Sequence, residues 1–112
     1  MSPVIEQVDL MSRMLDVAEM RHRIISHNIA NVNTPGFHRL EVSFEDVLNH
    51  TTGGDSEQLV IREQAGLPER ADGNNVDIDR EVGALHKNAT AYQTYAQLMA
   101  SQLQLMRRAI ET

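Results

Sequence analysis

The sequence has 112 residues, enough for one domain, and its formal net charge is −6. It contains no cysteine, which excludes a disulfide framework, a thiolate zinc site and a cysteine nucleophile. The acidic balance argues against nucleic acid as a partner, because that function needs a basic face. The acidity is concentrated in residues 41–81, which hold eleven acidic and only three basic residues. Glu6 and Asp9 lie where a secretory signal peptide has its basic and apolar regions, so we expect no cleavable signal of that type.

Residues 4–32 are predicted to form one long helix, because apolar side chains recur there at alternating spacings of four and three, as in a coiled-coil seam. The members of this repeat are Val4, Val8, Met11, Leu15, Ala18, His22, Ile25 and Ile29. A second apolar set on a neighbouring face consists of Leu10, Val17 and Ile24. The helix would be roughly 42 Å long, whereas a compact domain of about 100 residues has a radius of gyration of only about 13 Å. We therefore expect an elongated molecule.

The helix is predicted to end in a sharp turn. Pro35 fixes φ at the first central position of a turn and disfavours helix at Thr34, and Gly36 can take the positive φ that a type II turn needs next. Phe37 then gives the departing chain an apolar anchor. Asparagine side chains before the turn can cap carbonyl groups or tolerate left-handed backbone. We predict a hinge made of Asn28, Asn31, Asn33, Thr34, Pro35, Gly36 and Phe37.

Residues 33–76 lack a helical repeat and are predicted to be turn, extended chain and loop. Val42 and Phe44 alternate as in a short strand, and residues 59–61 are a second strand candidate. Residues 45–50 fit one or two helical turns, while residues 51–56 and 65–75 contain glycines typical of loops.

Residues 77–112 are predicted to form the second long helix, with Asp77 as its N-cap and with Asp79 and Glu81 in the first turn, where acids complement the helix dipole. Its apolar repeat is Val82, Leu85, Ala89, Tyr92, Ala96, Met99, Leu103, Met106 and Ile110. A second apolar set beside it is Ala84, Ala91, Leu98 and Leu105, with Tyr95 and Ala109.

The second helix carries no charge on any face between Asn88 and Met106. A solvated helix normally has charges on its outer face. The glutamine, threonine and serine residues of this window argue against a membrane span, because unpaired amides are costly in hydrocarbon. We therefore expect protein to cover this helix on several sides.

These elements predict a mainly α fold over residues 1–112, a single elongated domain. Its two long helices would form an antiparallel coiled-coil hairpin, with a short irregular, β-containing segment between them. The expected intrachain seam joins Val8, Leu15 and Ile25 to Met99, Leu103 and Met106. The neighbouring apolar faces would meet other subunits through Leu10, Val17, Ile24, Tyr95, Leu98 and Leu105.

The sequence offers no arrangement of residues typical of catalysis, cofactor binding or metal binding. Its five histidines include no pair four residues apart that could clamp a metal on a helix. Residues 72–81 contain several acids, but Gly73 is second in that run, and the calcium loop of an EF-hand needs glycine in sixth position. A glycine-rich phosphate loop and a serine elbow are also absent from the sequence. We therefore expect a protein without catalytic residues or a cofactor, and not an enzyme.

Residues 27–37, H-N-I-A-N-V-N-T-P-G-F, resemble the N-terminal signature of the flagellar rod, hook and hook-associated axial proteins. Residues 70–81, R-A-D-G-N-N-V-D-I-D-R-E, are followed by an uninterrupted helix and resemble the short proximal rod members of this family. The resemblance implies a structural subunit whose coiled-coil shaft assembles helically into the periplasm-spanning rod of the bacterial flagellar basal body and transmits motor torque. It implies as partners other rod subunits, the adaptor at the rod base, the membrane (MS) ring and the flagellar type III export apparatus, which exports such chains without a cleavable signal peptide.

Two other functions stay open at this point. A free-standing helical-bundle adaptor or chaperone would form a fixed, highly helical oligomer when dilute, whereas an isolated rod subunit is expected to be poorly ordered. A small metal-dependent enzyme would retain metal through purification, and the histidine spacing argues against it.

Overall fold

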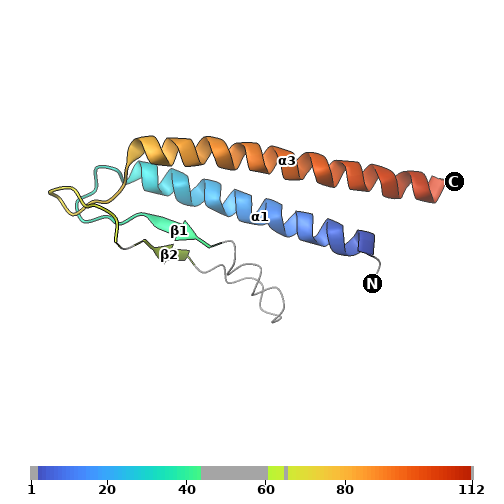
Figure 1. The fold of residues 1–112 in the computed structure, drawn as a ribbon, viewed down its shortest axis with the longest axis horizontal. Helices are drawn as coiled ribbons and strands as arrows, with labels where there is room; N and C mark the ends of the chain where they lie inside the picture. Colours follow the sequence, from blue (N-terminus) through green and yellow to red (C-terminus); the bar gives the residue numbers. More distant parts are fainter. Residues whose placement is uncertain (1–2, 44–60, 65, 112) are drawn as a thin grey trace.

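The computed structural model describes residues 3–43, 61–64 and 66–111, and two long helices dominate it. Helix α1 spans Pro3–Ala30 and helix α3 spans Ile78–Glu111. The helices lie side by side and antiparallel, so both chain termini are at the same end of the molecule, which we call the open end (Figure 1). The principal extents are 65 × 29 × 16 Å. The predicted mainly α hairpin is confirmed.

The helix ends follow from local chemistry. The Oδ1 of Asp77 accepts hydrogen bonds from the main-chain N–H groups of Asp79 and Arg80, at 3.1 and 3.4 Å. Asp77 is therefore the N-cap of α3, because it satisfies amides that have no partner within the helix. Helix α1 ends two residues before the predicted limit, and the chain then enters the turn that contains Gly36.

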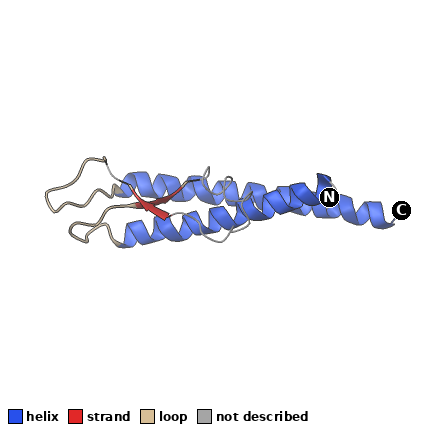
Figure 2. Cartoon of the chain, turned by 90° about the horizontal axis from the view of Figure 1, so that it is seen from below, coloured by secondary structure: helices blue, strands red, loops and turns tan. Residues whose placement is uncertain are grey.

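A two-stranded antiparallel sheet lies against α1 near the end of the hairpin opposite the termini, which we call the closed end (Figures 1 and 2). Strand β1 is Leu40–Val42 and strand β2 is Ile61–Glu63. Leu40 pairs with Glu63, and Val42 with Ile61. Both strands were predicted about two residues away, at 42–44 and 59–61. Phe44, the start of the second predicted strand, the helical turns at 45–50 and the loop at 51–56 lie outside the described residues.

The buried apolar core is small and lies near the closed end. Its members are Val17, Ala18, Ile24, Ile25, Val42 and Val76. When two helices pack together, each buries one face and leaves its outer face uncovered. The core is therefore deepest where β1 adds a third layer over α1. Toward the open end several apolar side chains of α3 are exposed, from 48 % for Leu98 and Leu103 to 83 % for Ile110. Within the described ranges, neither helix is long and apolar enough to cross a membrane.

Candidate functional site

The turn after α1 has the predicted geometry. Gly36 has φ +74°, and the Phe37 amide donates to the carbonyl of Thr34 at 3.2 Å, which closes a turn with glycine in its second central position. The Asn31 side chain donates to the His27 carbonyl at 2.8 Å and accepts from the Thr34 hydroxyl at 3.1 Å. The last turn of α1 is thereby tied to the turn that follows it.

Asn28 holds the strand that follows the turn against α1. Its side chain is fully buried, its Nδ2 donates to the Leu40 carbonyl, and its Oδ1 accepts from the Leu40 amide, both at 2.9 Å. A single amide group thus pairs with both main-chain groups of one residue, as a neighbouring strand would. Asn28 therefore ties the start of β1 to α1.

A second segment, residues 70–77, packs against the turn. The Gly36 amide donates to the Asp72 carbonyl at 2.8 Å. The fully buried Asn74 donates through Nδ2 to the carbonyls of Asn31 and Thr34, at 2.9 and 2.8 Å. A Cβ placed on Gly73 would lie 3.4 Å from the Gly36 Cα, and Gly73 has φ +83°. The two glycines therefore allow the two segments to approach closely.

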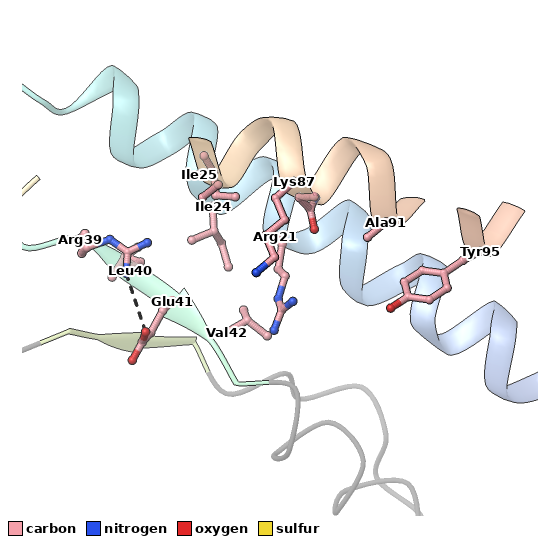
Figure 3. A pocket seen from close by; sticks show the side chains of 12 residues that line it. Arg21, Ile24, Ile25, Arg39, Leu40, Glu41, Val42, Lys87, Ala91 and Tyr95 are labelled. Carbon is pink, nitrogen blue, oxygen red and sulfur yellow. Dashed lines mark ion pairs between the residues drawn. The ribbon is translucent and has the colours of Figure 1, made fainter. Parts of the chain in front are cut away.

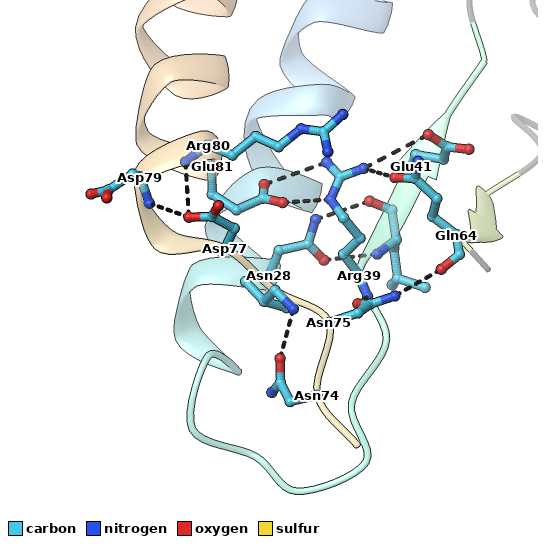
Figure 4. A network of polar contacts seen from close by, with 12 residues as sticks. Asn28, Arg39, Glu41, Gln64, Asn74, Asn75, Asp77, Asp79, Arg80 and Glu81 are labelled. Carbon is cyan, nitrogen blue, oxygen red and sulfur yellow. Dashed lines mark hydrogen bonds and ion pairs between the residues drawn. The ribbon is translucent and has the colours of Figure 1, made fainter. Parts of the chain in front are cut away.

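Arg39 and Asn75 connect this contact to the sheet and to α3 (Figure 4). The Arg39 amide donates to the Asn75 Oδ1 at 2.7 Å, and the Asn75 Nδ2 donates to the Gln64 carbonyl at 2.9 Å. The Arg39 guanidinium binds the carboxylate of Glu81, whose side chain is 1 % exposed, and the side-chain oxygen of Gln64. Together with Asn28 and Asn74, these residues form a polar network that we call the clasp.

The remaining hinge residues lie at the surface of the clasp. Asn33, Thr34, Pro35 and Gly36 are exposed, while Asn31 and Phe37 are half-buried. The Phe37 ring packs edge-on against the His27 ring, with centroids 5.6 Å apart. The hinge role of the seven predicted residues stays a prediction, although hydrogen bonds join Asn31, Thr34, Gly36 and Phe37 to residues 72–75.

The predicted seam residues are distributed unevenly. Ile25 is buried, and Val8, Leu15, Met99 and Met106 are half-buried. Leu103, in contrast, is 48 % exposed, and its neighbour Gln102 reaches α1 instead, with its Nε2 3.2 Å from the Gln7 Oε1.

The residues predicted to meet other subunits also divide into two groups. Leu10, Leu98 and Leu105 are exposed, at 44, 48 and 56 %, but Val17 and Ile24 are buried at 1 and 7 %. Ile24 lines a groove together with Val42 of β1, so this part of α1 is covered within the chain itself. The role of the six predicted residues in a subunit interface stays a prediction.

Tyr95 lines a groove of about 380 Å³ between α1, β1 and α3 (Figure 3). Ile24, Ile25, Val42 and Ala91 supply apolar walls, and Arg21, Lys87 and Glu41 are among the polar residues that line it. In the part of the chain that the structure describes, no group of three His, Cys, Asp or Glu side chains could hold a metal ion. The arrangement of side chains between α1, β1 and α3 is suited to holding these three elements in place.

Sequence reasoning missed most of the clasp. Glu81 was assigned to the helix dipole, and Arg39, Gln64, Asn74 and Asn75 were given no role. The signal that could have found them is the concentration of asparagines on both sides of the middle segment, since buried amides need main-chain partners.

Comparison with known proteins identifies the family. A family model described as flagella basal body rod protein matches residues 21–38, which contain the end of α1 and the turn. The chain is 36 % identical over 117 residues to the flagellar basal body rod protein FlgB of Borrelia hermsii, with 83 % of this chain and 87 % of that protein covered. It is 28 % identical to FlgB of Bacillus subtilis, with coverages of 76 and 78 %. A 35 % identical match to the rod protein FlgG of Caulobacter vibrioides covers 67 % of this chain and 25 % of that protein. The chain therefore belongs to the FlgB family of flagellar basal body rod proteins.

Proposed function

We propose that the protein is a structural subunit of the proximal rod of the flagellar basal body, where it assembles helically with other rod proteins and helps to transmit motor torque. Family membership supports the rod assignment. The observation that carries the assembly role is the apolar surface of α3 toward the open end, where Leu98, Leu103, Leu105 and Ile110 are 48–83 % exposed. Exposed apolar side chains gathered on one element are typical of a protein–protein contact.

The shape of the molecule supports a mechanical role. A shaft needs stiff, elongated elements and repeated contacts between subunits, and contacts that do not close on themselves produce a helical filament. The hairpin provides the stiff element, since its two long helices pack along their length. The clasp joins both helices at the closed end, so that a load on α1 reaches α3 through Asn28, Arg39 and Glu81.

The proposed partners follow from the family. Rod proteins such as FlgG would be neighbours along the rod, and the adaptor at the rod base and the MS ring would lie below. Export would proceed through the flagellar type III apparatus without a cleavable signal peptide. The exposed face of α3 is free of charge from Asn88 to Met106, so we expect its contacts with a neighbouring subunit to depend little on salt.

The test is to tag the chain in the organism that carries its gene and to purify basal bodies. We expect the tagged chain to co-purify with the rod, and deletion of its gene to leave cells without rods and without motility. A helical adaptor or chaperone would instead be recovered as a soluble oligomer of fixed size, with no tagged chain in the purified basal bodies. That result would contradict the proposal.

A further inference from the structure

Asn88 is a buried amide in the middle of the contact between the two long helices. Its side chain is 8 % exposed, and its Nδ2 donates to the main-chain carbonyl of Ala18 at 2.7 Å. This contact lies away from the clasp, between the Glu81–Arg39 pair at the closed end and the Gln7–Gln102 contact toward the open end. Asn88 therefore joins the central part of α3 directly to the main chain of α1.

The small side chain of Ala18 makes this bond possible. A helix carbonyl keeps a second lone pair after accepting its own helical hydrogen bond, but side chains normally cover it. Ala18 is 3 % exposed and carries only a methyl group, so the amide of Asn88 can reach the carbonyl. The residues one heptad away on the same face of α1 are Met11 and Ile25, and their longer side chains would keep the amide away from the main chain.

We propose that Asn88, paired with Ala18, sets the axial register of the α1–α3 hairpin. A slide by one heptad would also separate Glu81 from Arg39 at the closed end. Along the helices beyond the clasp, however, most of the other half-buried positions are apolar, and there the slide would exchange one apolar contact for another. The same slide would place Asn88 opposite Met11 or Ile25 and leave a buried amide without a partner, which is unfavourable. A single buried asparagine fixes register in coiled coils in the same way, at some expense in stability. The register in turn sets how far α3 extends beyond α1 at the open end.

The full chain has no cysteine, so an introduced pair of cysteines cannot react with a native thiol. The test uses such pairs. The side chains of Gln7 and Gln102 touch in the structure, so a bis-maleimide linker with the reach of two glutamine side chains should join the pair Q7C/Q102C in the observed register. The pairs Q7C/Y95C and Q7C/A109C report slides of one heptad in either direction, because the linker is too short to join thiols that are displaced along the helix by a further heptad. With Asn88 present we expect only the first pair to cross-link efficiently. With Asn88→Leu we expect the ratio of observed to shifted cross-linked product to fall by roughly tenfold or more.

The controls separate register from folding. Gln93→Leu makes an apolar substitution at an exposed position of α3 and should leave the ratio unchanged. Asn88→Ala removes the amide without adding a large apolar group, and it should lower the ratio while circular dichroism shows the helices retained. An unchanged ratio in both Asn88 variants would overturn the inference. Equal cross-linking of all three pairs in the parent chain, or loss of helicity in both Asn88 variants, would overturn it as well.

Discussion

Glu81, in the first turn of α3, and Arg39, one residue before β1, form an ion pair with 2.5 Å between the Arg39 Nε and the Glu81 Oε1. The two side chains are 1 and 14 % exposed, so neither charge has much access to water. The pair connects the start of α3 to the chain that leaves the turn at Gly36. Because charges removed from water must stay paired, we expect this pair mainly to specify how these segments meet.

Removing one partner of this pair should be far more damaging than removing both. Arg39→Met leaves the Glu81 carboxylate buried without a cation, which should reduce the free energy of unfolding by about 3–5 kcal/mol. The double variant Arg39→Met with Glu81→Met should recover much of that loss. Both effects can be measured by unfolding the protein in urea, with helicity as the signal, at a protein concentration where the chain is helical.

The exposed pair of Arg23 and Glu19 on α1 provides the control. Its charged atoms are 2.7 Å apart, but the side chains are 67 and 55 % exposed. Water screens such a pair, so Arg23→Met should cost less than about 1 kcal/mol. If Arg39→Met cost no more than Arg23→Met, the clasp would not depend on its buried ion pair.

Asn28 provides a second test of the clasp, because its amide is both donor and acceptor to Leu40. Asn28→Asp keeps an acceptor for the Leu40 amide but removes the donor to the Leu40 carbonyl and places a charge in a fully buried position. We expect a loss of at least about 1–3 kcal/mol and faster hydrogen exchange at the Leu40 amide. Asn33→Asp makes the same change at an exposed turn position and should alter stability by less than about 0.5 kcal/mol. Equal exchange at Leu40 in both variants would contradict the proposed role of Asn28.

The two helices, the N-cap at Asp77 and the positive φ at Gly36 could be predicted because each depends on local sequence. The seam of α3 was harder to place. Its buried or half-buried positions include Glu81, Asn88 and Gln102 at multiples of seven residues, and a count of apolar residues passes over all three. The count of apolar residues instead selected the position that follows each of these residues. One residue selected in this way, Leu103, is 48 % exposed. Polar residues that face a partner helix cannot be told from surface residues until the partner is known.

The clasp was inaccessible for a related reason. Asn74 and Asn75 lie more than 35 residues along the chain from the groups they bind around the hinge, and no periodicity connects the two segments. Their partners are mostly main-chain carbonyl and amide groups. Nearly every residue type has these groups, so the sequence does not indicate which of them will be bound. The burial of Ile24 was missed likewise, because Ile24 lies beside β1 and its burial depends on where this three-residue strand packs.

Gly36 is the residue of this turn whose substitution should be most restricted by backbone conformation alone. Its φ is +74° and no atom lies within 4 Å of the position a Cβ would take, so any penalty comes from the backbone and not from a clash. Gly36→Val should therefore distort the turn and impair rod assembly, with little change in the helicity of α1 or α3. Gly83, which is helical and also has open space around it, is the control. Gly83→Ala should stabilise the chain by about 0.5–1 kcal/mol and leave motility intact; normal motility with valine at position 36 would show that the turn tolerates other conformations.

The last prediction concerns the exposed apolar side chains of α3. Leu98 and Leu105 are seven residues apart, 48 and 56 % exposed, and lie beside the seam that faces α1. Replacing both with glutamate adds two charges at solvent-accessible positions, so the isolated chain should keep its helicity and become more soluble. The same charges would be buried without partners when a neighbouring subunit packs there, at a cost of several kcal/mol, and motility should be lost. Gln97→Glu with Gln104→Glu adds the same charges with the same spacing, on a face turned away from α1, and should be tolerated better. If the Leu98 and Leu105 double variant swims normally, these side chains do not contact another rod subunit, and the uncharged stretch of α3 has a different cause.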